Sequence, residues 1–340
     1  MKRATITASI CVIIAVLSLS TPLNAQAKKP VIKPMGGEAP VSHLTAYTVD
    51  TKAELTYQAW IRRNNVTLTS YRAFQHQKYP YFYPLAGPVT GLSLVTETSL
   101  PWPHHRGMFF GVDRVNGGNY WQDTLGRGQI RSRGVTLGEM SETSCVIKDA
   151  CIWGRPDAAM KIAEPIIEDS RTFTLKFIEG TQNYLIDAEI KLKALTDIKI
   201  ELTNHGLFGV RVTPDISVDG GGNMLTSTGK TNQKDSFGQP ADWIAFYGKR
   251  AGTEAVEGVA VILHPKYPDT EKFPVFKNCK WFTRDYGNIS PNPFQFIPKE
   301  TPWEFKAGEE LTLRYRTVAF AGTPEEAGIQ KLSDEFQKTE

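Results

Sequence analysis

Apolar and polar residues alternate with a period of two along much of the chain. The alternation is clearest in four segments: residues 172–177, 186–193, 198–203 and 311–316. Successive side chains of a β-strand point to opposite faces of a sheet, so each segment predicts a strand with one buried and one solvated face. The segments at 186–192 and 198–202 are joined by a short polar connection, which predicts an antiparallel hairpin.

The end of the chain carries the signals of an α-helix. Thr323 and Glu326 have the spacing of a capping box, and Pro324 stands at the first helical position. The apolar residues that follow share one helical face: Ile329, Leu332 and Phe336. We therefore predict a short amphipathic helix over residues 323–337 that packs on a sheet.

Together these patterns predict an all-β fold, a large antiparallel β-sandwich with a short C-terminal helix, as a single domain over residues 46–340. The frequent Gly (28) and Pro (21) residues favour short strands joined by tight turns over a helix bundle. A length of 340 residues accommodates one large β domain of this kind.

The first residues have the organisation of a secretory signal peptide, which we assign to residues 1–27. Lys2 and Arg3 precede an apolar stretch, and residues 25–27 form an A-x-A cleavage site. The protein is therefore expected in the periplasm or secreted, and an uncleaved anchor is the alternative. Residues 28–45 are rich in Lys, Pro and Gly and predict a disordered lead-in. No later stretch approaches the roughly 18 apolar residues of a membrane span.

Charge is nearly balanced, with 39 Lys and Arg against 36 Asp and Glu and a net charge of +3. Proteins that bind nucleic acid usually carry a clear basic excess, so nucleic acid is not an expected partner. Cys145 and Cys151 lie six positions apart. In an oxidising compartment they would close a small disulfide loop, and buried free thiols are the alternative.

The most unusual polar cluster is Pro-His-His-Arg-Gly at residues 103–107, directly before an apolar run. Imidazole serves as a general acid, a general base or a metal ligand, and guanidinium holds anions. We therefore predict a site in which His104 and His105 are catalytic and Arg106 contacts the substrate. A surface loop with stacked aromatic rings is the alternative.

Further candidates lie where strands meet loops, beside Gly or Pro. Asn116-Gly117 predicts a hairpin turn, and the glycine run at 220–222 predicts a close approach of the backbone. His264 and Asp113 are added as catalytic candidates. The other candidates for substrate binding are Trp121, Arg211, Asp215, Trp243, Arg284 and Asn292. Flat aromatic faces beside planar polar groups are typical of sugar sites, although a core Trp explains Trp121 equally well.

These blocks occur in an order that resembles the DUF6807 family of exported bacterial proteins, often labelled PmoA or methane oxygenase. The resemblance covers roughly residues 60–320 and rests on the blocks at 103–107, 116–121, 220–222, 238–243, 264–265, 284–287 and 292–294. It implies a β-sandwich encoded among carbohydrate-utilisation genes, and it supplies no catalytic residues. A membrane oxygenase subunit would need transmembrane helices, which the sequence does not predict. Family members commonly have Asp-His-Pro where this chain has Leu263-His264-Pro265.

Three functions are consistent with the sequence. The first is an exported carbohydrate-active enzyme that cleaves a glycosidic linkage of an oligosaccharide or polysaccharide fragment. Hydrolysis requires two carboxyls about 5–10 Å apart, whereas β-elimination requires a base such as His and a cation to hold a carboxylate. The acids near the blocks are Asp113, Asp123, Asp215, Asp242 and Asp285.

The second function is a non-catalytic glycan-binding protein with an aromatic site. The third is a metal-dependent oxidoreductase, in which His104, His105 and His264 converge with a carboxylate. No cofactor is expected, and a divalent metal at the His cluster is the alternative. For the first function we expect six residues to converge on one cleft: His104, His105, Arg106, Trp121, Arg211 and His264.

Overall fold

The protein is described from a computed structural model, in which residues 44–51, 56–122, 124–266, 268–277 and 279–339 are described. These residues belong to one compact unit, Pro40–Glu340. The predicted signal peptide, nearly all of the predicted lead-in and Asp123 lie outside the described residues. The first strand begins at Leu44, two residues before the predicted start of the domain. No helix in the described ranges has the length and apolar character needed to cross a bilayer.

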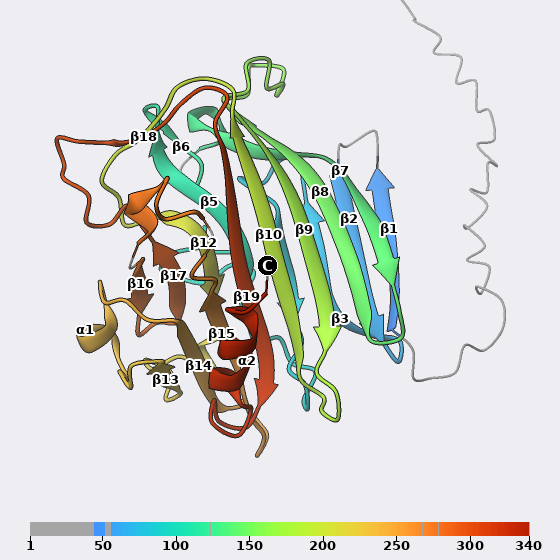
Figure 1. Cartoon of the computed structure of the whole chain (residues 1–340). Helices are drawn as coiled ribbons and strands as arrows, with labels where there is room; N and C mark the ends of the chain where they lie inside the picture. Colours follow the sequence, from blue (N-terminus) through green and yellow to red (C-terminus); the bar gives the residue numbers. More distant parts are fainter. Residues whose placement is uncertain (1–43, 52–55, 123, 267, 278, 340) are drawn as a thin grey trace, which may run out of the picture. The chain divides into compact units, whose positions relative to one another are not determined.

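The strands form two antiparallel sheets, which make a β-sandwich (Figure 1). Sheet 1 has eleven strands, eight of which follow one another in the order β1 (Leu44–Thr51), β2 (Thr56–Arg63), β3 (Val66–Ala73), β4 (Tyr81–Leu85), β5 (Met108–Val115), β12 (Gly206–Arg211), β17 (Asn288–Asn292) and β16 (Lys280–Arg284). Three short strands extend it beside β5: β6 (Gly118–Asn119), β11 (Ile198–Ile200) and β18 (Trp303–Phe305).

Sheet 2 has eight strands in the order β13 (Asn223–Thr226), β14 (Trp243–Lys249), β15 (Val256–Leu263), β19 (Glu310–Ala321), β10 (Tyr184–Ala194), β9 (Ile167–Phe177), β8 (Ser144–Gly154) and β7 (Gln129–Met140). Two short α-helices, α1 (Gln233–Ser236) and α2 (Ile329–Phe336), complete the regular structure together with the 3-10 turns at Leu125–Arg127, Pro214–Ile216 and Pro274–Phe276. The all-β sandwich with a short C-terminal helix is thus confirmed.

Most of the predicted strands and turns are present. The alternating segments at 172–177 and 311–316 lie in β9 and β19, where the apolar positions are buried. Asn116 and Gly117 both have positive φ values, of 48° and 68°, as the hairpin turn between β5 and β6 requires. A Cβ on Gly220 would lie 1.8 Å from the carbonyl oxygen of Pro214, so the glycine run does serve a close backbone approach.

The predicted hairpin between 186–192 and 198–202 is wrong. β10 pairs with β9 and β19 in sheet 2, whereas β11 pairs with β18 and β5 in sheet 1. The short connection therefore carries the chain from one sheet to the other. Period-two alternation identifies a strand with one buried face, but it contains no information about which strand becomes the neighbour.

The C-terminal helix is shorter than predicted. The capping-box contacts are present, since Thr323 N donates to Glu326 Oε2 at 2.8 Å and Glu326 N donates to Thr323 Oγ1 at 3.2 Å. The backbone then turns through Gly328, whose φ is +67°, and α2 begins only at Ile329. Its apolar face packs on the outer face of sheet 2, together with Val318 and Ile262 (Figure 1).

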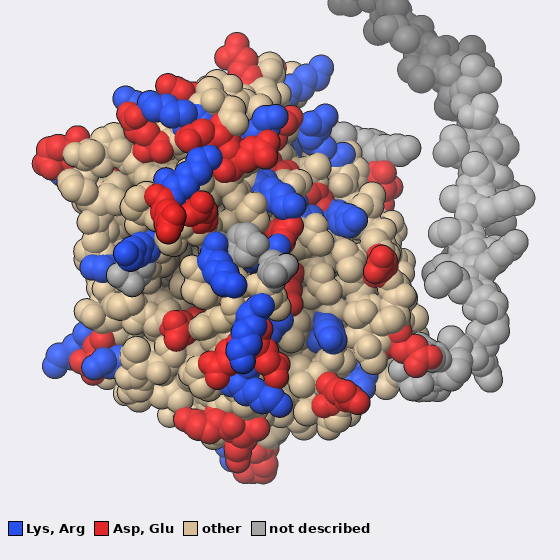
Figure 2. Space-filling view, viewed as in Figure 1, with Lys and Arg blue, Asp and Glu red and all other residues tan. Residues whose placement is uncertain are grey.

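The outer face of sheet 2 is polar and carries both signs of charge. Figure 2 shows Lys and Arg interspersed with Asp and Glu on the side that Figure 1 presents. Two of the contacts are the cross-strand ion pairs Arg314–Glu189 and Arg316–Asp187 between β19 and β10. Because the charges alternate in sign, this face has no extended basic patch of the kind that binds nucleic acid.

The predicted disulfide between Cys145 and Cys151 is not formed. Both thiols are buried and free, and both lie on the single strand β8, paired with Leu175 and Asp169 of β9. Six residues of extended chain span about 20 Å, whereas disulfide-bonded Cα atoms are less than about 7 Å apart. The spacing of the two residues in the sequence is compatible with a hairpin loop, but β8 runs without a turn from one cysteine to the other.

We expect all three cysteines of the described chain to react as free thiols. Purified, exported protein denatured without reductant in the presence of iodoacetamide should gain three carbamidomethyl groups, on Cys145, Cys151 and Cys279. The measurement is peptide mass spectrometry, with a sample reduced before alkylation as the control. A pair of cysteines that reacts only after reduction would contradict this expectation.

Candidate functional site

The candidate site lies on the outer face of sheet 1, over β5 and β12. Along β5 the even-numbered residues face sheet 2, where Phe110 contacts Trp153. The odd-numbered residues Phe109, Gly111 and Asp113 therefore face outward. A Cβ on Gly111 would lie 2.5 Å from the Tyr120 carbonyl oxygen, so a glycine is needed for the chain after β6 to cross this face.

Five ring side chains from four segments form a contiguous group, which we call the imidazole cluster: His104, His105, Trp121, His205 and Tyr286. The His104 and His105 rings are 4.4 Å apart between centroids, and His104 and His205 are 6.4 Å apart. Trp121 stacks on His205 at 5.6 Å and meets the His105 ring edge-on at 5.8 Å. The structure therefore brings residues separated by up to 182 positions, from 104 to 286, onto one surface.

Asp113 orients His205 within the cluster. The Nδ1 atom of His205 lies 2.9 Å from Asp113 Oδ2, and Asp113 Oδ1 accepts a hydrogen bond from the Thr203 hydroxyl. Because a carboxylate accepts a hydrogen bond from Nδ1–H, Nε2 of a neutral His205 is left as the proton acceptor. The His205 side chain is 22% exposed, so this nitrogen belongs to a reachable base.

His105 lies beneath this surface, with only 2% of its area exposed. Its ring is nearly parallel to the rings of Phe109 and Tyr286, at interplanar angles of 18° and 24° respectively. Burial, together with the nearby charges of His104, Arg211 and His205, lowers the pKa of His105 to about 2. His105 is therefore a neutral ring that supports the cluster, and His104 and His205 are its accessible imidazoles.

Two arginines flank Tyr286 at one side of the cluster. The guanidinium of Arg211 lies 4.1 Å from the centroid of the Tyr286 ring. Arg284 is half-buried and rests on Phe282 and Phe237, at 4.2 Å from each ring centroid. Burial raises the pKa of Tyr286, while the positive charges of Arg211 and Arg284 oppose that shift. This side of the site is thus cationic and suited to an anionic group.

Several buried polar atoms in the cluster and in the adjacent Arg211 have no hydrogen-bond partner among the described residues. They are both ring nitrogens of His105, Nε1 of Trp121, and Nε and Nη1 of Arg211. Unpaired buried polar atoms are uncommon in folded proteins and often mark sites that bind water or a ligand. Their concentration at one place separates this face from an ordinary packed surface.

Three of the predicted substrate-binding residues hold the fold instead. Asp215 accepts from Arg250 Nε at 2.9 Å, and Trp243 donates its indole N–H to Gln330 of α2 at 2.9 Å. Asn292 donates to the carbonyl of Thr203 at 2.8 Å and accepts from the backbone of Phe294. Each of the three residues thus has a polar group bound to a protein partner. Asn292 is linked to the site through Thr203, which also binds Asp113.

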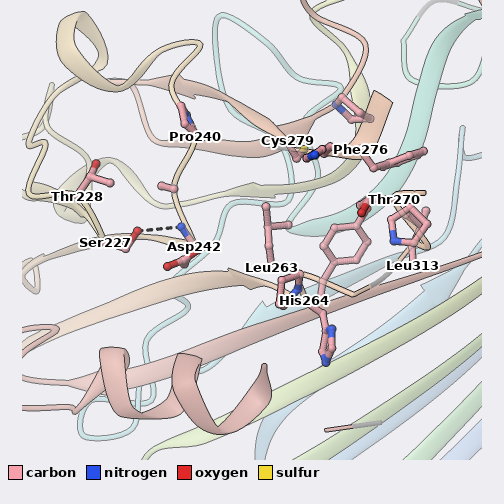
Figure 3. Close-up of a pocket in the computed structure, with 16 residues that line it drawn as sticks. Ser227, Thr228, Pro240, Asp242, Leu263, His264, Thr270, Phe276, Cys279 and Leu313 are labelled. Carbon is pink, nitrogen blue, oxygen red and sulfur yellow. Dashed lines mark hydrogen bonds between the residues drawn. The ribbon is translucent and has the colours of Figure 1, made fainter. Parts of the chain in front are cut away.

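His264 does not join the cluster, and the expected six-residue convergence is corrected here. It follows β15 in sheet 2, meets the Phe336 ring of α2 edge-on at 5.0 Å, and has Nε2 3.0 Å from the carbonyl of Thr339. Figure 3 shows its ring directed away from the other labelled residues of the neighbouring cavity. The guanidinium of Arg106 packs over the ring of Tyr81, which is not a member of the cluster, at 5.9 Å from its centroid.

The ligand set expected for a metal-dependent oxidoreductase required His264 beside His104 and His105. Within the described ranges, no three His, Cys, Asp or Glu side chains are grouped in a way that could hold a metal ion. The Trp121 ring contacts both His205, on which it stacks, and His105, which it meets edge-on.

Sequence reasoning missed His205 and did not single out Tyr286. A usable signal was present, because His205 directly precedes Gly206 and the apolar run at 207–210, much as the His104–Gly107 block precedes Met108. β12 and β5 are antiparallel neighbours, with Gly206 opposite Val112. A His before each strand of such a pair can fold over the same face, but the pairing itself was not evident from the sequence.

Comparisons with known proteins add a family and distant structural matches. The model of a family of unknown function, DUF6807, matches residues 58–334. No curated protein matches the sequence. Among solved structures, a putative aldose 1-epimerase from Klebsiella pneumoniae subsp. pneumoniae MGH 78578 has 9% identity and a TM-score of 0.38, covering 83% of this chain and 84% of that chain.

Two other matched structures are larger proteins. One is the galactosidase domain of an alpha-galactosidase–sucrose kinase, with 8% identity and a TM-score of 0.37, covering 81% of this chain and 42% of that chain. The other is a polysaccharide lyase, with 13% identity and a TM-score of 0.31, covering 78% of this chain and 34% of that chain. With likenesses this distant, an activity for this chain has to be argued from its own site.

Proposed function

We propose that this chain, which belongs to the DUF6807 family, is an exported enzyme that cleaves a glycosidic linkage of an acidic oligosaccharide by β-elimination. The observation that carries the proposal is the Asp113–His205 pair, set 6.4 Å from the second accessible imidazole of His104 and on the same surface as two arginines. Export rests on the signal-peptide pattern of residues 1–27.

His205 is the general base in this proposal. β-Elimination begins with removal of a proton from the sugar carbon that bears the carboxylate. Asp113 accepts a hydrogen bond from the Nδ1–H of His205, so that Nε2 is the free acceptor, and it stabilises the imidazolium that forms. The C–H electron pair becomes a carbon–carbon double bond as the neighbouring C–O bond breaks.

His104 is the general acid that completes the reaction. Its ring centroid is 6.4 Å from that of His205, which is close enough for both imidazoles to reach one sugar linkage. The protonated form gives its proton to the departing glycosidic oxygen, while His205 keeps the proton taken from carbon. The products are one unsaturated acidic sugar and one sugar with a new hydroxyl, and no redox partner is consumed.

Arg211 and Arg284 lower the cost of the carbanion-like transition state. Negative charge develops on the carboxylate as the proton leaves, and preorganised cations in a partly buried site stabilise that charge strongly. Arg284 is half-buried and can contact the carboxylate directly, whereas Arg211 lies under Tyr286 and acts through its field. Tyr286 carries a hydroxyl close enough to both arginines for their charges to act on its pKa.

Elimination fits the carboxylates of the site better than hydrolysis does. Hydrolysis uses two carboxyls on either side of the linkage, one of them protonated. The carboxylate of Asp113 is hydrogen-bonded to Thr203 and His205. The carboxylate of Asp215 is hydrogen-bonded to Arg250, and that of Asp285 to the backbone N–H of Gln233.

A glycan-binding protein is the second candidate, because two exposed aromatic rings flank the cluster. Trp102 is 44% exposed and meets the His104 ring edge-on, and Phe296 is 51% exposed beside Phe237. Exposed rings of this kind give sugar rings flat apolar faces. The same rings would position a substrate for the enzyme, so a test of turnover is needed to separate the two functions.

The decisive experiment incubates the purified mature protein with a panel of acidic and neutral oligosaccharides, with and without EDTA. We expect an ultraviolet-absorbing unsaturated uronate from acidic members of the panel and no product from neutral members. EDTA should leave the rate unchanged if His104 and His205 carry the protons. Saturated reducing ends as the sole products would replace elimination by hydrolysis, and binding without any product would favour the glycan-binding function.

A further inference from the structure

A separate cavity of about 390 Å³ lies at the edge of the sandwich, where β15 ends and the chain approaches β16 (Figure 3). Its volume falls within the range of small-molecule sites, roughly 300–1,000 Å³. Figure 3 shows Leu263, Leu313 and Phe276 on one side of it, and Ser227, Thr228 and Asp242 on the other. The imidazole cluster contributes no lining residue.

The walls of this cavity are apolar and stiff. Four prolines line it, Pro240, Pro265, Pro268 and Pro293, together with the side chains of Leu263, Leu313 and Phe276. A proline ring has a fixed φ and little side-chain freedom, so a cavity lined by prolines loses little conformational entropy when it is filled. Flat apolar surfaces of this type favour a ring-shaped apolar group.

The residues that line the cavity include a core tyrosine, Tyr315. Tyr315 is only 4% exposed and its ring stacks on Phe208 in the core, at 4.5 Å between centroids. Its hydroxyl makes no hydrogen bond to any described residue. Burial holds the pKa of Tyr315 well above its ordinary value, so the hydroxyl stays protonated and can both donate and accept.

His264 shapes the rim of the cavity and is not free to react. Its Nε2 atom lies 3.0 Å from the Thr339 carbonyl, and its Nδ1 atom accepts from the backbone of Lys266 at 3.2 Å. On the opposite rim, Ser227 Oγ accepts from the backbone N–H of Asp242 at 2.8 Å, which leaves the Asp242 carboxylate at the exposed mouth (Figure 3).

We propose that this cavity binds a small neutral aromatic alcohol, with its ring between the proline and leucine walls and its hydroxyl on Tyr315. A second polar substituent at the other end of the ring would reach the mouth, where Thr228 and Asp242 offer acceptors. A free sugar fits less well, because those of its hydroxyls that face the proline and leucine walls would lack hydrogen-bond partners. The proposal is independent of the activity proposed for the imidazole cluster.

The test uses 4-hydroxybenzyl alcohol as the probe and benzyl alcohol, which lacks the phenolic hydroxyl, as its matched control. Dissociation constants are measured by ligand-observed NMR titration of the mature protein. We expect the hydroxylated probe to bind about tenfold more tightly, and Tyr315→Phe to bring the two probes to within about twofold. Ala241→Phe should weaken both probes at least about tenfold, because Ala241 lines the cavity and a phenyl group there would fill it.

Circular dichroism establishes that each variant is folded before the titration. Three results would overturn the proposal: neither probe binds the wild-type protein, Ala241→Phe binds both probes as the wild type does, or the preference for the hydroxylated probe survives in Tyr315→Phe. Tyr315→Phe keeps the ring that stacks on Phe208, so it tests the hydroxyl even if Ala241→Phe fails to fold. Loss of turnover in cluster variants would leave all of these outcomes unaffected.

Discussion

Replacement of His205 by alanine is expected to reduce kcat/KM for an acidic oligosaccharide about 10³-fold, because the base that accepts the carbon-bound proton is removed. Asp113→Asn should have an effect of similar size, since an amide keeps the ring in place but can hold the wrong tautomer and cannot stabilise the imidazolium. The measurement is the initial rate of product formation across a series of substrate concentrations and pH values. In Asp113→Asn the acidic limb of the pH–rate profile should move along the pH axis, in addition to the fall in the maximal rate.

His76→Ala is the matched control, because His76 is an imidazole that stacks on Phe74 outside the imidazole cluster. Its kcat/KM should stay within about twofold of the wild-type value. Oligosaccharide binding should survive in His205→Ala, as judged by calorimetry, since the arginines and exposed aromatic rings remain. A His205→Ala variant with wild-type turnover would remove the base from the mechanism, and equal losses in His205→Ala and His76→Ala would point to folding as the cause.

The second large effect concerns acid stability, and its origin is His105. The pKa of His105 is lowered to about 2 by burial and by neighbouring positive charge, whereas an unfolded imidazole titrates near pH 6.5. Below pH 6.5 the unfolded chain therefore binds a proton that the folded protein does not. Stability is fully present above pH 6.5 and falls as the pH drops, by about 3 kcal/mol between pH 7 and pH 4.

His105→Phe isolates this contribution. A phenyl ring can occupy the position between Phe109 and Tyr286 and does not titrate. The free energy of unfolding, measured by urea denaturation at pH 7 and pH 4, should therefore decline about 3 kcal/mol less in His105→Phe than in the wild type. Parallel declines in the two proteins would show that His105 is protonated in the folded state, and its assignment as a neutral supporting ring would then fail.

Part of the site was accessible from the sequence, for identifiable reasons. His104 and His105 stand out because two imidazoles, a guanidinium, Gly and Pro occur together, a composition that is unusual on a plain surface loop. Arg211 and Trp121 were selected because each lies at a junction between strand and loop. Trp121 is a member of the cluster, and Arg211 contacts its Tyr286 ring. The same criterion also selected Trp243 and Asp215, whose polar groups bind Gln330 and Arg250. A position beside a turn identifies loops that can carry chemistry, but it does not say which loops meet.

The division of roles within the cluster depended on burial and on hydrogen-bond partners. His104 and His105 are adjacent in sequence, yet one ring is accessible and the other is enclosed by Phe109, Trp121 and Tyr286. The backbone after Pro103 directs the two side chains differently, and no local pattern specifies that difference. His205 was overlooked because its partner Asp113 lies 92 positions earlier and meets it only through the pairing of β5 with β12.

The sequence by itself determined the class of fold, the positions of most strands and turns, and the capping residues of the C-terminal helix. These features depend on interactions between residues close together in the chain: period-two alternation, positive φ at Asn-Gly, and a capping box. Only the tertiary structure decided which strands are neighbours, that Cys145 and Cys151 lie along one strand, and that His264 contacts α2 and not the cluster. Pairing of strands joins residues far apart in sequence, and its free energy comes from side chains packed across the sheets, which no local pattern encodes.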